Sequence, residues 1–381
     1  MVSPVTFALQ PRRTFAAQMK TKASTPQPGS KRRRKASAPK VRLEEVAQEA
    51  GVSAATVSRV LNNASLVTQD LRDKVLKATS KLGYVAHGAA RALASRRSRV
   101  LGAVVPNLSN TIFSDMIEGF QQRLEPQGYT MLLATFNYDE AAEFRSVRTM
   151  IERGVDGLVL VGVTHSKELE VLLNSSGIPF IQTWAPARAS AHPTIGYDNA
   201  TAARLLVDHL VGLGHRDIGV VAGLTQHNDR VRARIAGLRA AMRRHRIPLP
   251  ADRIVQTEYR IAKVREAFRV LQRKGELPTA LIANNDVVAL GLLLEAQAQG
   301  IRVPAQLSIV GVGDLEIVTH MRPPLTTVRS PKHTIGAMAA DYLLARISGH
   351  DFAIPEELPL ELVVRGSTAP PRTTRRKDIS A

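Results

Sequence analysis

Between Val41 and Leu61 the apolar residues recur at the spacing of two short helices separated by a tight turn. Gly51 predicts the end of the first helix, because glycine adopts a positive φ without a Cβ penalty. Ser53 suits the N-cap of the second helix. The apolar face of the first helix is Leu43, Val46, Ala47 and Ala50, and that of the second is Val57, Val60 and Leu61. A third amphipathic helix is predicted from Gln69 to Leu82, where Gly83 stops it.

The second helix leaves a short, polar and basic face outside the predicted core. That face consists of Ala54, Ala55, Thr56, Ser58 and Arg59. A helix with such a face fits a DNA major groove, which is about 12 Å wide. The pattern therefore predicts a helix-turn-helix, although two helices and a glycine turn alone are equally typical of an αα-hairpin.

From Val100 onward the pattern alternates between short apolar strands and amphipathic helices, which predicts parallel sheets with helices on both faces. The expected strands are Val100–Val105, Tyr129–Thr135, Gly157–Val161, Pro179–Thr183, Ile218–Ala222, Ala280–Ala283 and Leu307–Val312. The expected helices are Phe113–Gln127, Glu140–Arg153, Ala200–Gly212, Val231–Arg246, Ala262–Lys274 and Val287–Gly300. The predicted fold class is α/β, with an all-α head preceding a parallel-sheet body.

The positive charge of the chain is concentrated at its two ends. Of the net charge of +19, residues 1–40 carry +10, residues 41–99 carry +5, and the tail from Pro370 carries +3. This distribution favours a polyanion-binding head on a nearly neutral body. Residues 1–40 have no periodic apolar pattern, and we interpret them as a disordered basic extension. Translation from Met19, or a solvated tail without a role, explains that segment equally well.

Several ordered motifs together identify a family resemblance. They are V-A-Q-E-A-G-V-S-A-A-T-V-S-R-V-L-N from Val46, L-G-Y-V-A from Leu82, A-R-A-L-A-S-R-R-S from Ala90, V-D-G-L-V-L from Val155, L-G-H-R-D-I from Leu213 and P-T-A-L-I-A-N-N-D from Pro278. In this order and spacing the chain resembles the LacI/GalR family of bacterial transcription regulators from about Val41 to Gly366.

The resemblance implies a division of the chain. It places a DNA-binding head at residues 41–86, a hinge or linker at 87–99, and an effector-binding and dimerisation body at 100–366. The body would have two lobes, as in periplasmic sugar-binding proteins. Lobe 1 would span about 100–194 and 325–365, and lobe 2 about 195–324. Residues 367–381 are expected to be a disordered tail without the heptads of a tetramer.

On the DNA side, the resemblance implies a homodimer that binds pseudo-palindromic operator DNA. Arg59 and Thr56 would contact bases or phosphates, Ala54 and Ala55 would make apolar contacts, and Ser53 and Ser58 suit phosphates. In the hinge, Ala90 and Leu93 match family positions, with Leu93 as a minor-groove wedge. The alternative for Leu93 is an apolar linker residue.

On the effector side, the resemblance implies ligand contacts in the cleft between the lobes. The matching positions are Asn110, Phe113, Trp184, Arg234, Tyr259, Asn285 and Asp314. Trp184 could stack on a sugar or simply pack, whereas His165 and Asp286 are better explained as a solvated loop residue and a helix N-cap. Gly313 stands where the family usually has an aspartate, which removes a repulsion against anions. Arg234 and this loss predict a sugar acid such as gluconate, as in the gluconate-repressor-like branch.

Enzymatic motifs are missing from the sequence. It contains no G-x-x-x-x-G-K, H-E-x-x-H or G-x-S-x-G, and His209 and His215 have no third metal ligand in sequence reach. We expect no enzyme activity, cofactor, metal site or membrane span, and a cytoplasmic protein. The other class that fits the body is a periplasmic-type sugar-transport receptor, against which the helix-turn-helix argues.

Overall fold

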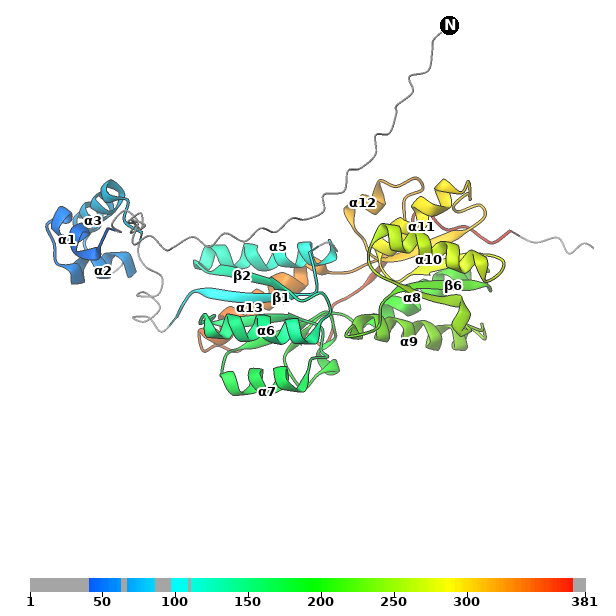
Figure 1. Cartoon of the computed structure of the whole chain (residues 1–381), viewed down its shortest axis with the longest axis horizontal. Helices are drawn as coiled ribbons and strands as arrows, with labels where there is room; N and C mark the ends of the chain where they lie inside the picture. Colours follow the sequence, from blue (N-terminus) through cyan, green and yellow to red (C-terminus); the bar gives the residue numbers. More distant parts are fainter. Residues whose placement is uncertain (1–40, 63–66, 86–96, 109–110, 373–381) are drawn as a thin grey trace, which may run out of the picture. The chain divides into compact units, whose positions relative to one another are not determined.

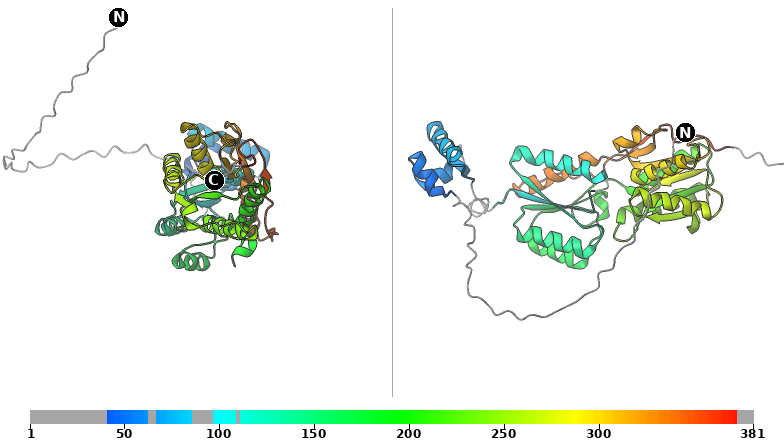
Figure 2. Two further views of the ribbon diagram at one scale, coloured as in Figure 1. Left: turned by 90° about the vertical axis from the view of Figure 1, so that its right-hand side faces the viewer. Right: turned by 45° about the horizontal axis from the view of Figure 1, so that its top comes forward.

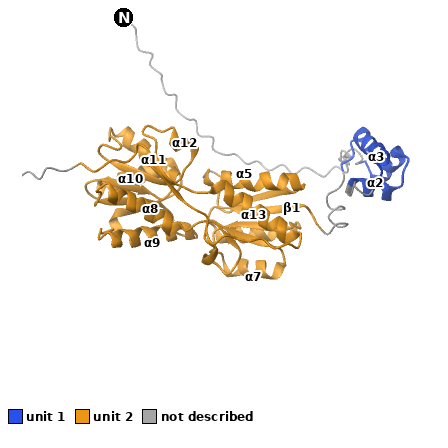
Figure 3. Ribbon diagram, turned by 180° about the vertical axis from the view of Figure 1, so that it is seen from behind, with its two compact units in different colours: residues 1–86 blue, residues 87–381 orange. Residues whose placement is uncertain are grey.

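The computed structural model describes residues 41–62, 67–85, 97–108 and 111–372. The chain divides into two compact units, residues 1–86 and residues 87–381 (Figure 3), and each is described by itself. The basic extension, Ala90, Leu93, Asn110 and the last nine residues lie outside the described part of the chain. Their expected roles remain predictions.

The first unit contains three helices with the predicted turn signals. They are α1 (Leu43–Ala50), α2 (Ala54–Asn62) and α3 (Gln69–Leu82). Gly51 has a φ of 65°, and its amide donates to the carbonyls of Ala47 and Gln48, which closes α1. The Ser53 hydroxyl accepts from the Thr56 amide at 3.1 Å, as expected of an N-cap residue.

A small apolar core joins these helices. Its buried members are Val46, Ala47, Val57, Val60, Val75 and Ala78. Burying each valine side chain contributes ~1.5–3 kcal/mol, so this core can hold three short helices together. Ala55 and Arg59 are exposed as predicted, whereas Ala54, Thr56 and Ser58 are half-buried, and Ala54 packs in part against the core.

The second unit begins with a five-stranded parallel sheet of order β2-β1-β3-β4-β5. Its strands are β1 (Val100–Val105), β2 (Thr130–Thr135), β3 (Gly157–Val161), β4 (Phe180–Thr183) and β5 (Thr194–Ile195). One face is covered by α5 (Ile112–Leu124) and α13 (Lys332–Ile347), the other by α6 (Glu140–Glu152) and α7 (Lys167–Ser176) (Figure 1). This sheet and its helices form lobe 1.

A second sheet of six strands has the order β11-β10-β9-β8-β6-β7 and forms lobe 2. All its pairings are parallel except that of β11 with β10. Its strands are β6 (Ile218–Gly223), β7 (Ile254–Thr257), β8 (Ala280–Ala283), β9 (Ser308–Gly313), β10 (Thr326–Arg329) and β11 (Glu361–Val363). The pair α8 (Asn199–Gly212) and α9 (Asp229–Arg244) covers one face, and the pair α10 (Ile261–Arg273) and α11 (Asp286–Ala298) covers the other (Figures 1 and 2).

Shorter segments complete the fold. They are the helix α12 (Glu316–Thr319) and the 3-10 turns Glu125–Gln127, Ala187–Ala189 and Ala251–Arg253. No helix in the described ranges combines the length and apolarity needed to cross a membrane.

The predicted return of the chain to lobe 1 at about Leu325 was wrong in its position. The strand β10 pairs in parallel with β9, from Thr326 beside Val310 to Arg329 beside Gly313, so it extends the second sheet. The return begins with α13, which packs against α5. It ends before β11, which pairs with β10 in the second sheet, so the predicted end of this segment at about residue 365 was also wrong. The two threonines of β10, Thr326 and Thr327, are buried in lobe 2, and the chain crosses to lobe 1 only after this strand.

The predicted disorder of residues 367–381 does not hold for its first part. Ser367 is fully buried, and its carbonyl accepts from the Ile309 amide at 2.9 Å. Its hydroxyl donates to the Ile309 carbonyl at 2.6 Å. These bonds fasten Ser367 to lobe 2, because they satisfy the Ile309 amide and carbonyl just before β9 begins to pair with β10 at Val310.

Two glycines allow α5 and α13 to approach at backbone distance. A Cβ on Gly336 would lie 1.8 Å from the Met116 carbonyl oxygen, and one on Gly119 would lie 2.3 Å from the His333 carbonyl oxygen. Any larger residue must push the helices apart. The close packing of α5 against α13 therefore requires glycine at these positions because there is no space for a side chain, and not because the backbone has a positive φ.

Candidate functional site

The loops at the carboxyl ends of the strands in both lobes surround one cleft, which is where open parallel sheets hold ligands. The cleft has two parts. The outer groove, of about 1230 Å³, is lined by residues that include Asn107, Asn137, Glu140, Leu224, His227, Glu258, Ile261 and Ile317. The inner chamber, of about 20 Å³, is lined by Ile112, Phe113, Tyr138, Trp184, Tyr197, Asn228, Arg230, Arg234, Tyr259 and Asn285.

Five of the predicted effector contacts meet in the inner chamber: Phe113, Trp184, Arg234, Tyr259 and Asn285. They come from both lobes and from positions up to 172 residues apart in the sequence. In this arrangement the chamber has room for about one water molecule. A ligand the size of a sugar therefore enters only if the chamber walls move.

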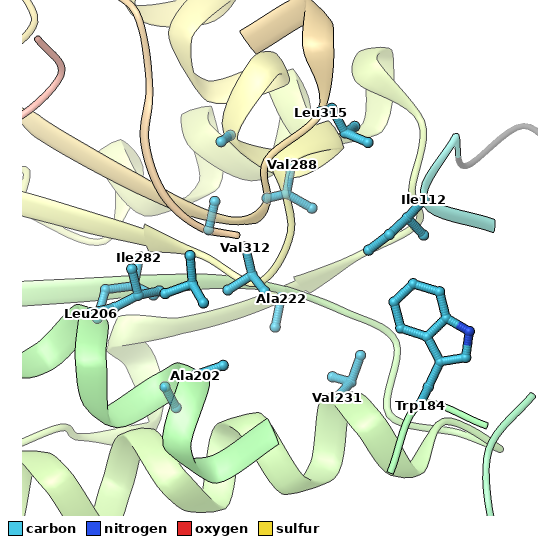
Figure 4. Close-up of a cluster of buried hydrophobic side chains, with 14 of the residues drawn as sticks. Ile112, Trp184, Ala202, Leu206, Ala222, Val231, Ile282, Val288, Val312 and Leu315 are labelled. Atoms are coloured by element: carbon cyan, nitrogen blue, oxygen red, sulfur yellow. The ribbon is translucent and has the colours of Figure 1, made fainter. Parts of the chain in front are cut away.

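Trp184 forms a packed wall of the chamber. It is 2% exposed and has a φ of 71°, which is unusual for a large residue. Its ring meets Phe113 edge-on at 5.5 Å between centroids and Tyr197 at 6.1 Å. Its indole Nε1 donates to the Met116 sulfur at 2.9 Å. Figure 4 shows the ring beside Ile112 at the margin of the apolar cluster, so most of its surface packs while one part lines the chamber.

Arg234 is held by neutral amides. It lies on α9, is 8% exposed, and donates through Nη1 to Asn199 Oδ1 and through Nη2 to Asn284 Oδ1 at 3.4 Å. The Tyr259 hydroxyl donates to the same Asn284 oxygen at 3.3 Å. Among the described residues no carboxylate lies within ion-pair distance of Arg234. Its positive charge is therefore not neutralised by an acid.

One turn earlier on α9, Arg230 is paired with an acid. Its Nη1 donates to Asp229 Oδ1 at 2.6 Å, and Asp229 Oδ2 accepts from the Val163 amide of lobe 1 at 2.6 Å. Burial alone would raise the pKa of Asp229, but the Arg230 charge and the amide donors outweigh it and lower that pKa. A Cβ on Gly162 would lie 2.3 Å from Arg230 Nη1, so this junction between the lobes needs a glycine.

Counting only the described residues, four buried polar atoms at or beside the chamber have no hydrogen-bond partner. They are the Tyr197 hydroxyl, Arg230 Nη2, Arg234 Nε and Asn284 Nδ2. The last three can only donate. Burial raises the pKa of Tyr197, which keeps its hydroxyl neutral. The chamber thus presents excess donors and, from Asp229, Arg230 and Arg234, a net charge of +1.

Asp314 is not brought to the chamber, which contradicts its predicted role. Its carboxylate accepts from Arg329 Nε at 2.7 Å and from Arg365 Nη2 at 2.6 Å. Burial opposes its ionisation, but these two arginines outweigh burial and lower its pKa. Asp314 therefore ties β10 to the segment after β11.

Two further side chains differ from expectation. His165 is not solvated: it is 8% exposed, with Nδ1 at 3.1 Å from Glu143 Oε1. Asn285, not Asp286, is the N-cap of α11, because its Oδ1 accepts from the Val288 amide at 2.9 Å. Asp286 instead accepts from the Leu315 amide and the Thr327 hydroxyl, and burial raises its pKa to about 6.

Sequence reasoning missed Tyr138, Tyr197, Asn199, Arg230 and Asn284. A signal existed for Arg230, since it stands four residues before Arg234 and so shares its helix face. Asn284 directly precedes a predicted contact. Tyr138, Tyr197 and Asn199 lie in loops or at a helix start, where no pattern marked them. Among the described residues no group of three His, Asp or Glu side chains is placed to hold a metal ion.

On the first unit, α2 presents the candidate DNA-contacting face. Ser53, Ala55 and Arg59 are exposed, and Thr56 and Ser58 are half-buried. The Ser53 and Thr56 hydroxyls lie 2.9 Å apart and hydrogen bond to each other. The face is short and carries one cation, which suits a groove contact.

A helix-turn-helix head and a two-lobed body with a chamber between parallel sheets define the class of ligand-responsive DNA-binding regulators. The comparisons agree. The family described as "Bacterial regulatory proteins, lacI family" matches residues 42–87, and the "Periplasmic binding protein-like domain" matches residues 207–368. This chain belongs to the LacI family of bacterial regulatory proteins.

Individual relatives cover most of the chain. The transcriptional repressor PurR of Vibrio parahaemolyticus is 32% identical over 85% of this chain and 98% of its own length. The lac repressor dimer bound to operator and an anti-inducer has a TM-score of 0.77 at 28% identity, covering 87% of this chain and 100% of that one. The regulator GntR of Chromobacterium violaceum has a TM-score of 0.66 at 27% identity, covering 71% and 99%.

These likenesses identify the protein as a LacI-family transcriptional repressor with a DNA-binding domain and an effector-binding domain. Its relatives are repressors and not enzymes. The alternative of a transport receptor is not favoured, because such a receptor has no lacI-type head.

Proposed function

We propose that this repressor is controlled by a sugar acid such as gluconate, bound in the inner chamber. One observation carries the proposal: in the described part of the chain, the chamber has unpartnered donors and a buried Arg234 without an acid. An unmet buried donor costs about 1–3 kcal/mol. A ligand that carries a carboxylate and hydroxyl oxygens would supply the missing acceptors.

Charge selects the acid over the neutral sugar. A hydrogen bond to a charged group contributes about 1.5–3 kcal/mol, which corresponds to roughly 10- to 150-fold in affinity. Asp314, the acid that would repel an anion, is turned to Arg329 and Arg365. We therefore expect gluconate to bind at least about tenfold more tightly than glucose, a neutral sugar without a carboxylate.

The chamber walls supply the link to DNA binding. Phe113 and Trp184 belong to lobe 1, and Arg234 and Asn285 to lobe 2. A ligand that enlarges the chamber of about 20 Å³ must change how these walls face each other. Because occupancy and lobe arrangement are linked, the ligand can shift the operator affinity.

The first test uses the full chain and an operator selected from a palindromic DNA library. Fluorescence polarisation measures operator affinity with gluconate and with glucose. We expect gluconate alone to change that affinity. Tight binding of glucose with no binding of gluconate, measured by isothermal titration, would refute the sugar-acid proposal.

A variant pair tests the placement of the acid group. Arg234→Ala should abolish gluconate binding and leave operator binding intact. Arg239→Ala removes an exposed arginine from the same helix and should change neither. A gluconate response that survives in Arg234→Ala would show that the acid group binds elsewhere.

On the DNA side we propose a homodimer on a pseudo-palindromic operator. The face of Ser53, Ala54, Ala55, Thr56, Ser58 and Arg59 would contact each half-site, and Ala90 and Leu93 its centre. Leu93→Ala should weaken operator binding and leave gluconate binding unchanged. A stable tetramer in analytical ultracentrifugation would contradict the dimer.

A further inference from the structure

The carboxylate of Asp156 holds Ser98 and Arg99, the last two residues of the predicted hinge or linker. Its Oδ1 accepts from the Ser98 amide at 2.8 Å and from the Ser98 hydroxyl at 3.0 Å. Its Oδ2 accepts from the Arg99 amide at 2.8 Å. Both oxygens of one carboxylate are thus used on two consecutive residues, and bonds to an ionised acceptor are about twice as strong as neutral ones.

Neighbouring bonds fasten the same segment to lobe 1. Arg97 Nη2 donates to the Ile347 carbonyl at the end of α13 at 2.6 Å. The Thr130 amide donates to the Arg99 carbonyl at 2.9 Å, and the Asp156 amide to the Val100 carbonyl at 2.7 Å. The start of β1 is therefore attached at the amino ends of β2 and β3, opposite the effector chamber.

Asp156 directly precedes β3, and the other end of β3 contacts lobe 2. After Val161 the chain reaches the Val163 amide, which donates to Asp229 beside the chamber arginine Arg230. The strand is buried along its whole length between β1 and β4. Five residues of strand span about 17 Å, so one short rigid element joins the chamber to the linker attachment.

We propose that Asp156 is a positioning residue that transmits the arrangement of the lobes to the DNA-binding head through β3. Movement of lobe 2 reaches β3 at Val163. The strand carries it to Asp156, which fixes where the segment from Ser98 leaves lobe 1. The coupling to an effector rests on the proposed function. The role of Asp156 in positioning the segment that leads to the head requires only that the protein is a repressor.

Asp156→Asn in the full chain tests this role. The asparagine side chain keeps the shape of aspartate but has one oxygen in place of two. The backbone amide of either Ser98 or Arg99 therefore loses its acceptor. We expect operator affinity to fall about tenfold, and hydrogen exchange at Ser98 and Arg99 to speed up, because a charged bond is lost. Gluconate affinity should stay within about twofold of the wild-type value. The midpoint of urea unfolding of the body should stay within about 0.3 M of the wild-type midpoint.

Matched variants separate positioning from general destabilisation. Glu152→Gln removes the same charge from an exposed residue of lobe 1 and should change none of these readouts. Ser98→Ala removes one of the three bonds to Asp156, together with the hydroxyl that accepts from the Val100 amide at 3.1 Å, and should lower operator affinity in part. Ser98→Thr keeps the hydroxyl and should restore it. If Asp156→Asn does not fold, Ser98→Ala and Ser98→Thr still test the positioning role.

Two results would overturn the proposal. One is unchanged operator affinity in Asp156→Asn and Ser98→Ala. The other is a loss of operator affinity that is matched by losses of gluconate affinity and stability, which indicates a merely structural bond. If wild-type protein ignores gluconate, the sugar-acid proposal fails, and operator affinity and hydrogen exchange still decide on Asp156.

Discussion

Replacing Asp229 with asparagine should destabilise the body, because it leaves a buried arginine without its acid. The Asp229 and Arg230 side chains are 13% and 6% exposed. Breaking a buried pair by removing one partner costs about 3–5 kcal/mol. The asparagine oxygen can still accept from the Val163 amide, so we expect the lower end, ~3 kcal/mol.

The assay is urea unfolding followed by fluorescence of Trp184, the single tryptophan, which is 2% exposed in the chamber wall. At a denaturant slope of ~3 kcal/mol per M, the midpoint should fall by about 1 M without a change in slope. Glu152→Gln, which breaks an exposed pair with Arg148, should cost less than about 0.5 kcal/mol.

A double variant makes the reasoning refutable. Asp229→Asn with Arg230→Met removes the unpaired charge, so it should be more stable than Asp229→Asn alone. A single-variant cost below about 1 kcal/mol, or a double-variant cost equal to the sum of both singles, would refute the buried-pair account. Because the pKa of Asp229 is lowered by folding, the stabilisation is present above the unfolded pKa of about 3.9 and is lost as pH falls.

Three further predictions follow from the described geometry. Gly336→Ala should cost at least about 3 kcal/mol in urea unfolding, because its Cβ would meet the Met116 carbonyl at 1.8 Å, whereas Gly212→Ala, with open space, should be nearly neutral. Folding raises the pKa of Asp286 to about 6, so its contribution is full below about pH 4 and is lost as pH rises through 6. Asp286→Asn should flatten the dependence of stability on pH across that window. An unchanged dependence would show that another group causes it. Arg59→Ala should weaken binding to the selected operator, and equal affinity by fluorescence polarisation would remove Arg59 from the interface.

The elements that sequence predicted well are those whose own residues specify them. The apolar run of β1 and the capped, amphipathic α3 have their predicted bounds. The missed β5 has only two residues, and β7 has four, of which only Val255 and Thr257 are buried, so both are too short to produce a clear pattern. The sheet assignment of β10 depended on its partner β9, which no local pattern reveals.

In the site, too, sequence located some residues, whereas others depended on contacts between distant parts of the chain. The resemblance located Arg234 and Trp184, and the i,i+4 spacing could have located Arg230. Sequence could not show that Asp314 points to Arg365, since the two are 51 residues apart and meet only in the folded lobe. The unpartnered donors are likewise a property of packing, because a donor is unmet only relative to its neighbours in space.

Control of DNA binding requires that the effector prefer one arrangement of the lobes, and the chamber has this property by construction. Its apolar walls, Phe113 and Trp184, move with lobe 1, whereas Arg230 and Arg234 move with lobe 2. A ligand held between them loses contacts when the lobes rotate, so its affinity differs between the two arrangements. A difference of ~1.4 kcal/mol, about one charged hydrogen bond, already changes an equilibrium tenfold. Under the proposed function, one charged bond to the unmet donors of this chamber is therefore enough to shift operator affinity about tenfold.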